Sequence, residues 1–279
     1  MDRTTQKEHV QQFRRLHESD RALVLVNAWD AVSARLFEDA GSPAIGTTSA
    51  GMAWSLGYAD GERVSRRELL GACERICRAV RVPVTVDIER GFGSTPQDVC
   101  ATVRDLLELG VAGINIEDGR VEGKLAASNA LVQKIAALRA LVGEMGGDLF
   151  INARTDVYFV AWDDPRARYE AALSRAEEYI AAGADGVFVP GLDDLDEIAA
   201  MSRKLVRPLN VYAGYEGVPA VADLQRAGVR RVSLGCGPLQ ALLAHARRIA
   251  TEALGEGTYT AMTADMLDNG AVNALFTRA

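Results

Sequence analysis

The chain has 279 residues, of which 48% are hydrophobic and 25% are charged, and its formal net charge is −7. Acidic residues (38) outnumber basic ones (31), which argues against nucleic acid as a partner. The polar N-terminus is not a signal peptide, and no apolar run approaches the roughly 20 residues of a membrane span. Four cysteines are too few for a disulfide framework in a chain of this length. We therefore expect a cytoplasmic, globular protein with no membrane partner.

Short apolar runs recur along the chain and predict eight strands. Four of them follow a helical segment that ends in a small residue and glycine, at Ala40-Gly41, Leu109-Gly110, Ala182-Gly183 and Ala227-Gly228. Glycine just past a helix end commonly takes the left-handed conformation that closes the helix. The other four runs occupy 22–27, 82–87, 148–154 and 206–211. All are apolar almost throughout, as expected for strands buried on both faces.

The segments between these runs have helical spacing, clearest at 66–80 and 166–182. Alternating strands and helices favour a parallel sheet with right-handed crossovers. Eight such units predict an α/β fold of the closed (β/α)8 type, and no GxGxxG motif follows the first strand to suggest a dinucleotide site. We expect one domain over 1–279, in which 239–279 forms extra C-terminal helices interrupted at Gly255 and Gly257.

Polar residues gather where the predicted strands end. In a barrel these ends converge on one mouth, where catalysis takes place. The residues at the strand ends are Asn27, Thr48, Ser49, Ala50, Asp87, Glu89, Glu117, Asp118, Arg154 and Asn210, with Asp60 in the loop after the second strand. Several carboxylates in a small volume require a countercharge. None of the three histidines lies at a strand end, so oxygen ligands predict Mg²⁺ first and Mn²⁺ second.

Simpler interpretations exist for individual residues. A single Asp at a strand end is commonly a helix cap, and the Asp87–Glu89 segment with its following glycines is also typical of a turn. Cys73 and Cys77 have the spacing of helix-core residues, and Cys236 is expected to pack as a small side chain. The basic pairs at 230–231 and 247–248 are interpreted as solvated faces. Only the coincidence of many polar strand ends favours a metal site.

Six segments occur in an order that carries a family resemblance: VNAWDAVSARLFEDAG, TTSAGMAWSLGYADGE, PVTVDIERGFG, VAGINIED, INARTD and AGADGVFVPG. From about Phe13 to about Leu254 the chain resembles the isocitrate lyase/phosphoenolpyruvate mutase superfamily, and within it the short members. The resemblance implies a barrel enzyme that breaks or forms a bond next to a 2-oxo acid and requires Mg²⁺.

Carried over by position, the resemblance implies that Asp87 binds the metal directly, while Glu89, Glu117 and Asp60 hold its waters. Asp60, Glu117 and Arg154 are the expected catalytic residues. The substrate is expected to contact Thr48, Ser49, Ala50, Arg154 and Asn210. Family members are usually tetramers that exchange a C-terminal helix, for which 239–254 is the candidate, so we expect a homo-oligomer, either a dimer or a tetramer.

The chain also departs from the family pattern. The segment 119–130 lacks the Cys and His of the lyases' acid-bearing loop, and Pro190-Gly191 replaces the mutase His or lyase Glu. Arg90 stands beside the expected metal ligands, where it either binds a substrate carboxylate or pairs with Glu89. The sequence thus predicts a Mg²⁺-dependent lyase or hydrolase that cleaves a C–C bond next to the carbonyl of a small 2-oxo or substituted malate-type dicarboxylic acid, through an enolate. P–C chemistry on a phosphonopyruvate-like substrate and a catalytically weak 2-oxo acid binder are the alternatives; the general acid and the substrate stay open.

Overall fold

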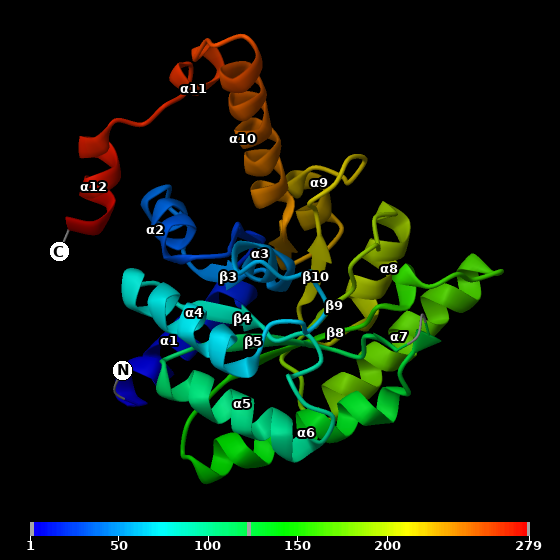
Figure 1. Ribbon diagram of the computed structural model, residues 1–279. Coiled ribbons are helices and arrows are strands. Elements are labelled where there is room, and N and C mark those ends of the chain that lie inside the picture. Colours follow the sequence, from blue (N-terminus) through cyan, green and yellow to red (C-terminus); the bar gives the residue numbers. More distant parts are fainter. Residues whose placement is uncertain (1–2, 122–123, 278–279) are drawn as a thin grey trace.

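The computed structural model describes residues 3–121 and 124–277, and it shows a parallel barrel surrounded by helices (Figure 1). The barrel strands are β1 (Leu23–Leu25), β2 (Asn27–Ala28), β3 (Ile45–Thr47), β4 (Val84–Asp87), β5 (Gly113–Glu117), β8 (Phe150–Arg154), β9 (Gly186–Phe188), β10 (Leu209–Tyr212) and β11 (Arg231–Ser233). A two-stranded hairpin, β6 (Arg120–Val121) with β7 (Lys124–Leu125), follows β5. The predicted fold class is confirmed.

The helices follow in alternation with the strands. They are α1 (Arg3–Glu18), α2 (Ala31–Asp39), α3 (Ser49–Ser55), α4 (Arg66–Ala79), α5 (Pro96–Glu108), α6 (Ser128–Glu144), α7 (Pro165–Ala181), α8 (Leu195–Lys204), α9 (Val221–Arg226), α10 (Gly237–Gly255), α11 (Thr260–Thr263) and α12 (Asn269–Thr277), with a 3-10 turn at Val157–Phe159. Capping boxes begin α2 at Asp30, α4 at Ser65 and α5 at Thr95, so local sequence sets these starts. None of the helices in the described part of the chain is long and apolar enough to span a bilayer.

The first strand closes the barrel in two pieces. β1 pairs in parallel with β11, whereas β2 pairs in parallel with β3, and Val26 separates the two pieces. The single run predicted at 22–27 is therefore interrupted. Asn27 links the two sides of this break. Its amide donates to the carbonyl of Thr47 in β3 (2.9 Å), and its oxygen accepts from the N–H of Gly235 after β11 (2.9 Å).

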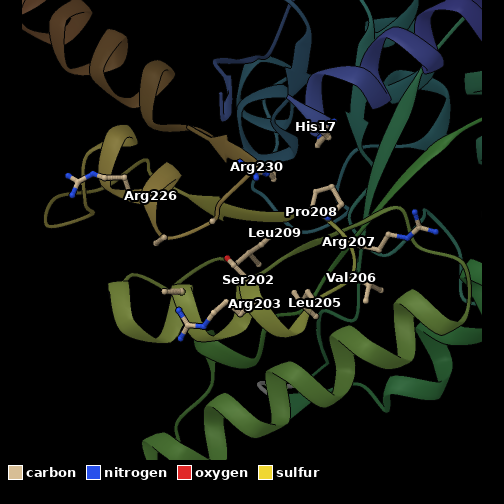
Figure 2. Close-up of a pocket in the computed structure, with 13 residues that line it drawn as sticks. His17, Ser202, Arg203, Leu205, Val206, Arg207, Pro208, Leu209, Arg226 and Arg230 are labelled. Carbon is tan, nitrogen blue, oxygen red and sulfur yellow. The ribbon is translucent and has the colours of Figure 1, made fainter. Parts of the chain in front are cut away.

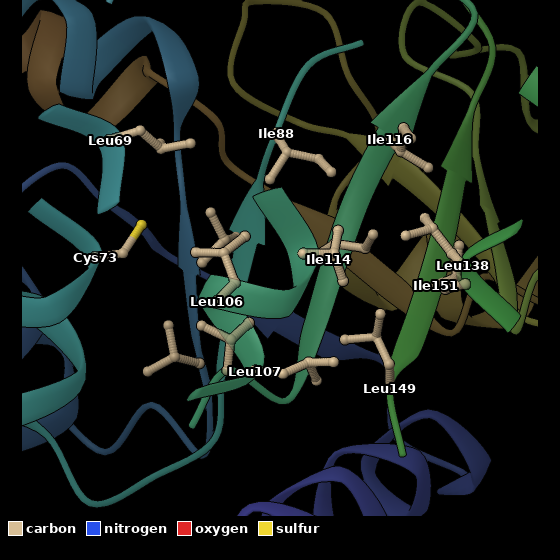
Figure 3. Packing of buried hydrophobic residues seen from close by; sticks show 14 of the residues in the cluster. Leu69, Cys73, Ile88, Leu106, Leu107, Ile114, Ile116, Leu138, Leu149 and Ile151 are labelled. Carbon is tan, nitrogen blue, oxygen red and sulfur yellow. The ribbon is translucent and has the colours of Figure 1, made fainter. Parts of the chain in front are cut away.

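The hydrophobic core lies between the strands and the helix ring. Ile114, Ile116 and Ile151 of the barrel pack toward Leu106 of α5 and Leu138 of α6, as Figure 3 shows. Cys73 and Cys77 are buried in this layer, so their predicted role as helix-core residues is confirmed. The predicted helices at 66–80 and 166–182 are α4 and α7, within one residue at each end.

Two features were not expected from the sequence. α1 is a helix whose buried Phe13 and His17 pack on Phe150 at the N-terminal end of the barrel. The strand expected at 206–211 begins only at Leu209, because Pro208 has no N–H to donate to a ladder.

The C-terminal helices extend away from the barrel. Figure 1 shows α10 projecting outward, α11 at its far end, and α12 returning beside α2. Arg35 of α2 donates to the carbonyl of Leu275 (2.6 Å), which holds α12 there. On α10, Leu242, Leu243 and Leu254 are 51%, 49% and 89% exposed. This long helix therefore presents an apolar face without a covering element in the described chain.

Candidate active site

The C-terminal end of β4 places Asp87 at the mouth of the barrel. One oxygen of its carboxylate accepts a hydrogen bond from the hydroxyl of Ser49 (3.0 Å), and the other accepts from the N–H of Glu89 (3.2 Å). The N–H of Asp87 donates to the Thr47 hydroxyl (2.9 Å). Asp87 is only 9% exposed, so its carboxylate is held in a defined position at the strand end.

The loop after β4 holds Glu89 in a backbone conformation that non-glycine residues rarely adopt (φ +48°). Its carboxylate accepts from the N–H of Glu62 (2.8 Å). Glu62 in turn pairs with Arg90 (2.9 Å) and accepts from the N–H of Phe92 (3.0 Å). The ion-pair partner of Arg90 is therefore Glu62, and the alternative of an Arg90–Glu89 pair is wrong. Strained backbone of this kind concentrates at functional sites.

Glu117 and Arg154 meet at the ends of the neighbouring strands β5 and β8, where they are in register. Arg154 Nη1 lies 2.9 Å from Glu117 Oε2, and Arg154 Nε donates to Asp156 (2.7 Å). The Glu117–Arg154 contact lacks hydrogen-bond geometry, so the buried Oε2 accepts no hydrogen bond from the described residues. Burial raises the pKa of Glu117 to about 8, against the positive charge of Arg154.

The four predicted metal-site carboxylates influence one another electrostatically. Burial is the largest cause that raises the pKa of Glu89 to about 8, and the negative charges of Asp87 and Asp60 add to it. Partial desolvation and Asp87 also raise the pKa of Asp60, while Arg154 acts in the opposite direction. The charges of Asp87 and Glu89 likewise raise the pKa of Glu117. The mouth therefore gathers more negative charge than Arg154 neutralises.

These residues fit a hydrated divalent cation better than a directly caged one. Within the described residues, no three His, Cys, Asp or Glu side chains lie close enough to coordinate one ion together. Mg²⁺ keeps several waters and is usually bound by one or two carboxylates, which suits Asp87 as the direct ligand. Glu117, which Arg154 contacts through Oε2, is a candidate to hold a metal-bound water.

The segment predicted to bind the substrate carboxylate forms the start of α3. Thr48 is its N-cap, and its hydroxyl accepts from the N–H of Gly51 (3.4 Å). The Ser49 hydroxyl is directed to Asp87, and Ala50 is buried. Ser49 thus lies beside the expected metal ligand, whereas the Thr48 side chain caps the N-terminus of α3.

Two strand-end residues are buried and hydrogen-bonded within the barrel wall or interior. Asp118 is fully buried and accepts from Thr155 (2.6 Å), Tyr179 (2.8 Å) and Arg175 (2.8 Å), so it anchors α7 to the barrel wall. Asn210 is 1% exposed inside the barrel, where its oxygen accepts from Ser233 (3.2 Å). Its amide nitrogen has no hydrogen-bond partner in the described chain, and its contact with the substrate stays a prediction.

Sequence reasoning missed Tyr212 at the end of β10. Its ring packs against Gly214, just after β10, and Gly235, just after β11, where a Cβ would come within 2.4 or 2.5 Å of it. Its hydroxyl lies 4.0 Å from Cys236 Sγ. Burial and then Cys236 raise the pKa of Tyr212 to about 12, so the phenol is protonated at neutral pH. The period-two pattern of β10 together with the glycines that follow could have indicated this residue.

Two hollows mark the two ends of the barrel. One of about 370 Å³ adjoins the mouth and is lined by Glu62, Arg90, Glu117 and Lys134 among others. Another, of about 500 Å³, lies at the opposite end, beside the chain segments that enter β10 and β11. Figure 2 shows arginines around this second hollow, their side chains spread rather than converging. Of the four clustered carboxylates, Glu117 lines the first hollow.

Comparisons with known proteins agree with this geometry. The family model described as phosphoenolpyruvate phosphomutase matches residues 13–254. The chain belongs to the phosphoenolpyruvate mutase/isocitrate lyase superfamily. An uncharacterised protein of Mycobacterium tuberculosis is 38% identical over 245 residues, which cover 86% of this chain and 89% of the relative. A 2-methylisocitrate lyase of Halalkalibacterium halodurans is 30% identical, over 94% of this chain and 87% of the relative.

A solved structure from Burkholderia cenocepacia J2315 superimposes on this superfamily member with a TM-score of 0.89. It is 35% identical and the match covers 99% of this chain and 98% of that chain. The C-terminal helices therefore lie within the matched region, together with the barrel.

Proposed function

We propose that this superfamily member is a Mg²⁺-dependent lyase or hydrolase that cleaves a C–C bond next to the carbonyl of a small 2-oxo or substituted malate-type dicarboxylic acid. The observation that carries the proposal is the cluster of Asp60, Asp87, Glu89 and Glu117, in which neighbouring negative charges raise the pKa of Asp60, Glu89 and Glu117 and Arg154 supplies positive charge. Relatives with named activities include a C–C lyase. The proposal treats 1–279 as one barrel domain with its C-terminal helices.

Each residue has a part that follows from its position. Asp87, held by Ser49, is the direct metal ligand, while Asp60, Glu89 and Glu117 accept hydrogen bonds from the metal's waters. Negative charge that develops on a substrate carbonyl oxygen would be stabilised by Mg²⁺, or by Mn²⁺ in its place, when bound there. Arg154 is oriented by Glu117 and Asp156, and it binds the anionic substrate at the mouth.

The segment 119–130 has neither Cys nor His, so we infer that the proton donor lies elsewhere. Tyr212 meets this need, because its hydroxyl lies at the mouth and stays protonated at neutral pH. The enolate left by bond cleavage would take its proton from this phenol. Tyr212→Phe should then lower kcat by about 100-fold or more and leave KM within about threefold of the wild-type value.

The exposed apolar face of α10 supports assembly into a homo-oligomer, a dimer or a tetramer, in which 239–254 packs on a neighbouring copy. Leu242 and Leu243 are half exposed and Leu254 almost fully so. Light scattering of the purified chain should give a mass of at least twice 29.9 kDa, and Leu242→Asp with Leu243→Asp should shift it to the monomer.

A substrate panel tests the proposed reaction. Oxaloacetate, 2,3-dimethylmalate, 2-methylisocitrate and phosphonopyruvate would each be incubated with the enzyme and MgCl₂, and the products would be identified by mass spectrometry. We expect C–C cleavage of at least one dicarboxylic acid, lost in Asp87→Ala and retained in Cys236→Ala. Turnover of phosphonopyruvate alone would point to P–C chemistry, and binding of oxalate without any turnover would point to a 2-oxo acid binder.

A further inference from the structure

Arg231 of β11 points into the barrel and is the largest fully buried side chain of the described residues, at 1% exposure. Its neighbour Arg230 borders the outer hollow at the N-terminal end of the barrel, where Figure 2 labels it. Successive residues of a strand face opposite sides. The interpretation of 230–231 as a solvated face is therefore wrong for Arg231.

No carboxylate pairs with this guanidinium in the described chain. Arg231 Nε donates to Ser233 (3.2 Å) and Nη2 donates to Asn115 (3.2 Å), but Nη1 has no hydrogen-bond partner. The Phe13 ring, at 6.0 Å, closes its other side. Burying a charge without an ionic partner is strongly unfavourable. A neutral side chain of similar length would be expected to stabilise the barrel more than this arginine does.

The hydrogen bond to Asn115 places the charge next to the active site. Asn115 is the register partner of Asp87 on the adjacent strand, and Asn152 on the next strand donates to the same Asn115 oxygen (2.9 Å). These inward residues form one polar layer directly below the mouth. Burial lowers the pKa of Arg231 to about 9, against the charge of Asp87, so the guanidinium is positively charged at neutral pH.

We propose that Arg231 is a positioning residue of the active site: a fixed positive charge inside the barrel, below Asp87, that offsets the negative charge of the mouth carboxylates and of the dianionic ligand bound above them. Arg231 does not touch the substrate in this account. It acts through the Asn115–Asp87 layer, where little water screens its charge. The inference rests on the proposed function, since it concerns a 2-oxo acid dianion at the same mouth.

The test compares three variants of the full chain by calorimetric titration of oxalate at saturating MgCl₂ and by thermal unfolding. Arg231→Met removes the charge and keeps the length, Arg231→Lys keeps the charge, and Arg230→Met is the matched control at the preceding residue, just before β11. We expect oxalate binding at least about tenfold weaker in Arg231→Met, a dissociation constant within about threefold of wild type in Arg231→Lys, and no change in Arg230→Met. The melting temperature of Arg231→Met should equal or exceed that of the wild type.

The outcomes separate function from structure. Wild-type affinity for oxalate in Arg231→Met would overturn the inference while leaving the proposed function intact. Equal loss of affinity in Arg231→Met and Arg231→Lys, with lower melting temperatures in both, would show a purely structural role. If Arg231→Met did not fold, that result alone would contradict the expected stability and overturn the inference. If the wild-type chain bound no oxalate in the presence of MgCl₂, that result would contradict the proposed function itself.

Discussion

The raised pKa of Glu117 predicts that stability without metal falls as pH rises. The unperturbed value is 4.5 and the value in the folded chain is about 8, so between these values the folded state holds a proton that the unfolded state has lost. Each pH unit in this window then lowers the free energy of unfolding by about 1.4 kcal/mol. The contribution of Glu117 between pH 5.5 and pH 8 is therefore about 3 kcal/mol.

Glu117→Gln isolates this effect, because the amide resembles the protonated carboxyl group and does not titrate. Urea unfolding in EDTA should show the stability of Glu117→Gln, relative to wild type, growing by about 3 kcal/mol between pH 5.5 and pH 8.5. Adding MgCl₂ at pH 8.5 should reduce that difference, since the cation stabilises the ionised wild-type carboxylate. A wild-type chain that gains stability relative to Glu117→Gln as pH rises would refute the reasoning.

Three further predictions concern the mouth and its support. At saturating MgCl₂, oxalate at 100 times its dissociation constant should add about 2.7 kcal/mol to the free energy of unfolding and raise the melting temperature, and a scan without any shift would count against the metal site. Asp118→Ala should destabilise the chain by about 3–5 kcal/mol in urea unfolding, because the buried hydroxyls of Thr155 and Tyr179 lose their acceptor and Arg175 loses its ion pair; a change under 1 kcal/mol would contradict this. Gly235→Ala should cost about 1–3 kcal/mol, since its φ is +53° and its Cβ would meet the Tyr212 ring, whereas Gly143→Ala in open space on α6 should stabilise by up to about 1 kcal/mol.

The sequence predicts the barrel well because the signals involved are local. Glycines after helices, capping boxes and continuous apolar runs each act within a few residues, and eight repeats leave little choice of topology. The break at Val26 could not be foreseen, because it depends on β1 and β2 pairing with strands from opposite ends of the chain. The late start of β10 could have been predicted, because Pro208 lies within the apolar segment 206–211 and cannot donate a backbone hydrogen bond.

At the site, the predicted strand ends gave the positions of the carboxylates in the chain. They did not show which side chains beside them point to the mouth. Glu117 and Asp118 are adjacent, yet one faces the mouth and the other is fully buried against α7. The same alternation separates Arg230 from Arg231. An arginine is rarely fully buried without a carboxylate partner, so from the sequence alone an arginine is expected to be exposed to solvent. Which of two successive polar residues faces inward depends on strand register, and register is set by the assembled barrel.

A crystal structure of the full chain with MgCl₂ and oxalate tests the central claim most directly. Our account predicts one metal ion at the mouth, bound by Asp87 and by oxalate, with Glu89 and Glu117 hydrogen-bonded to its waters and Arg154 beside the oxalate. A metal ion bound elsewhere, or a mouth in which Asp87 and Glu117 contact neither the metal ion nor its waters, would contradict it.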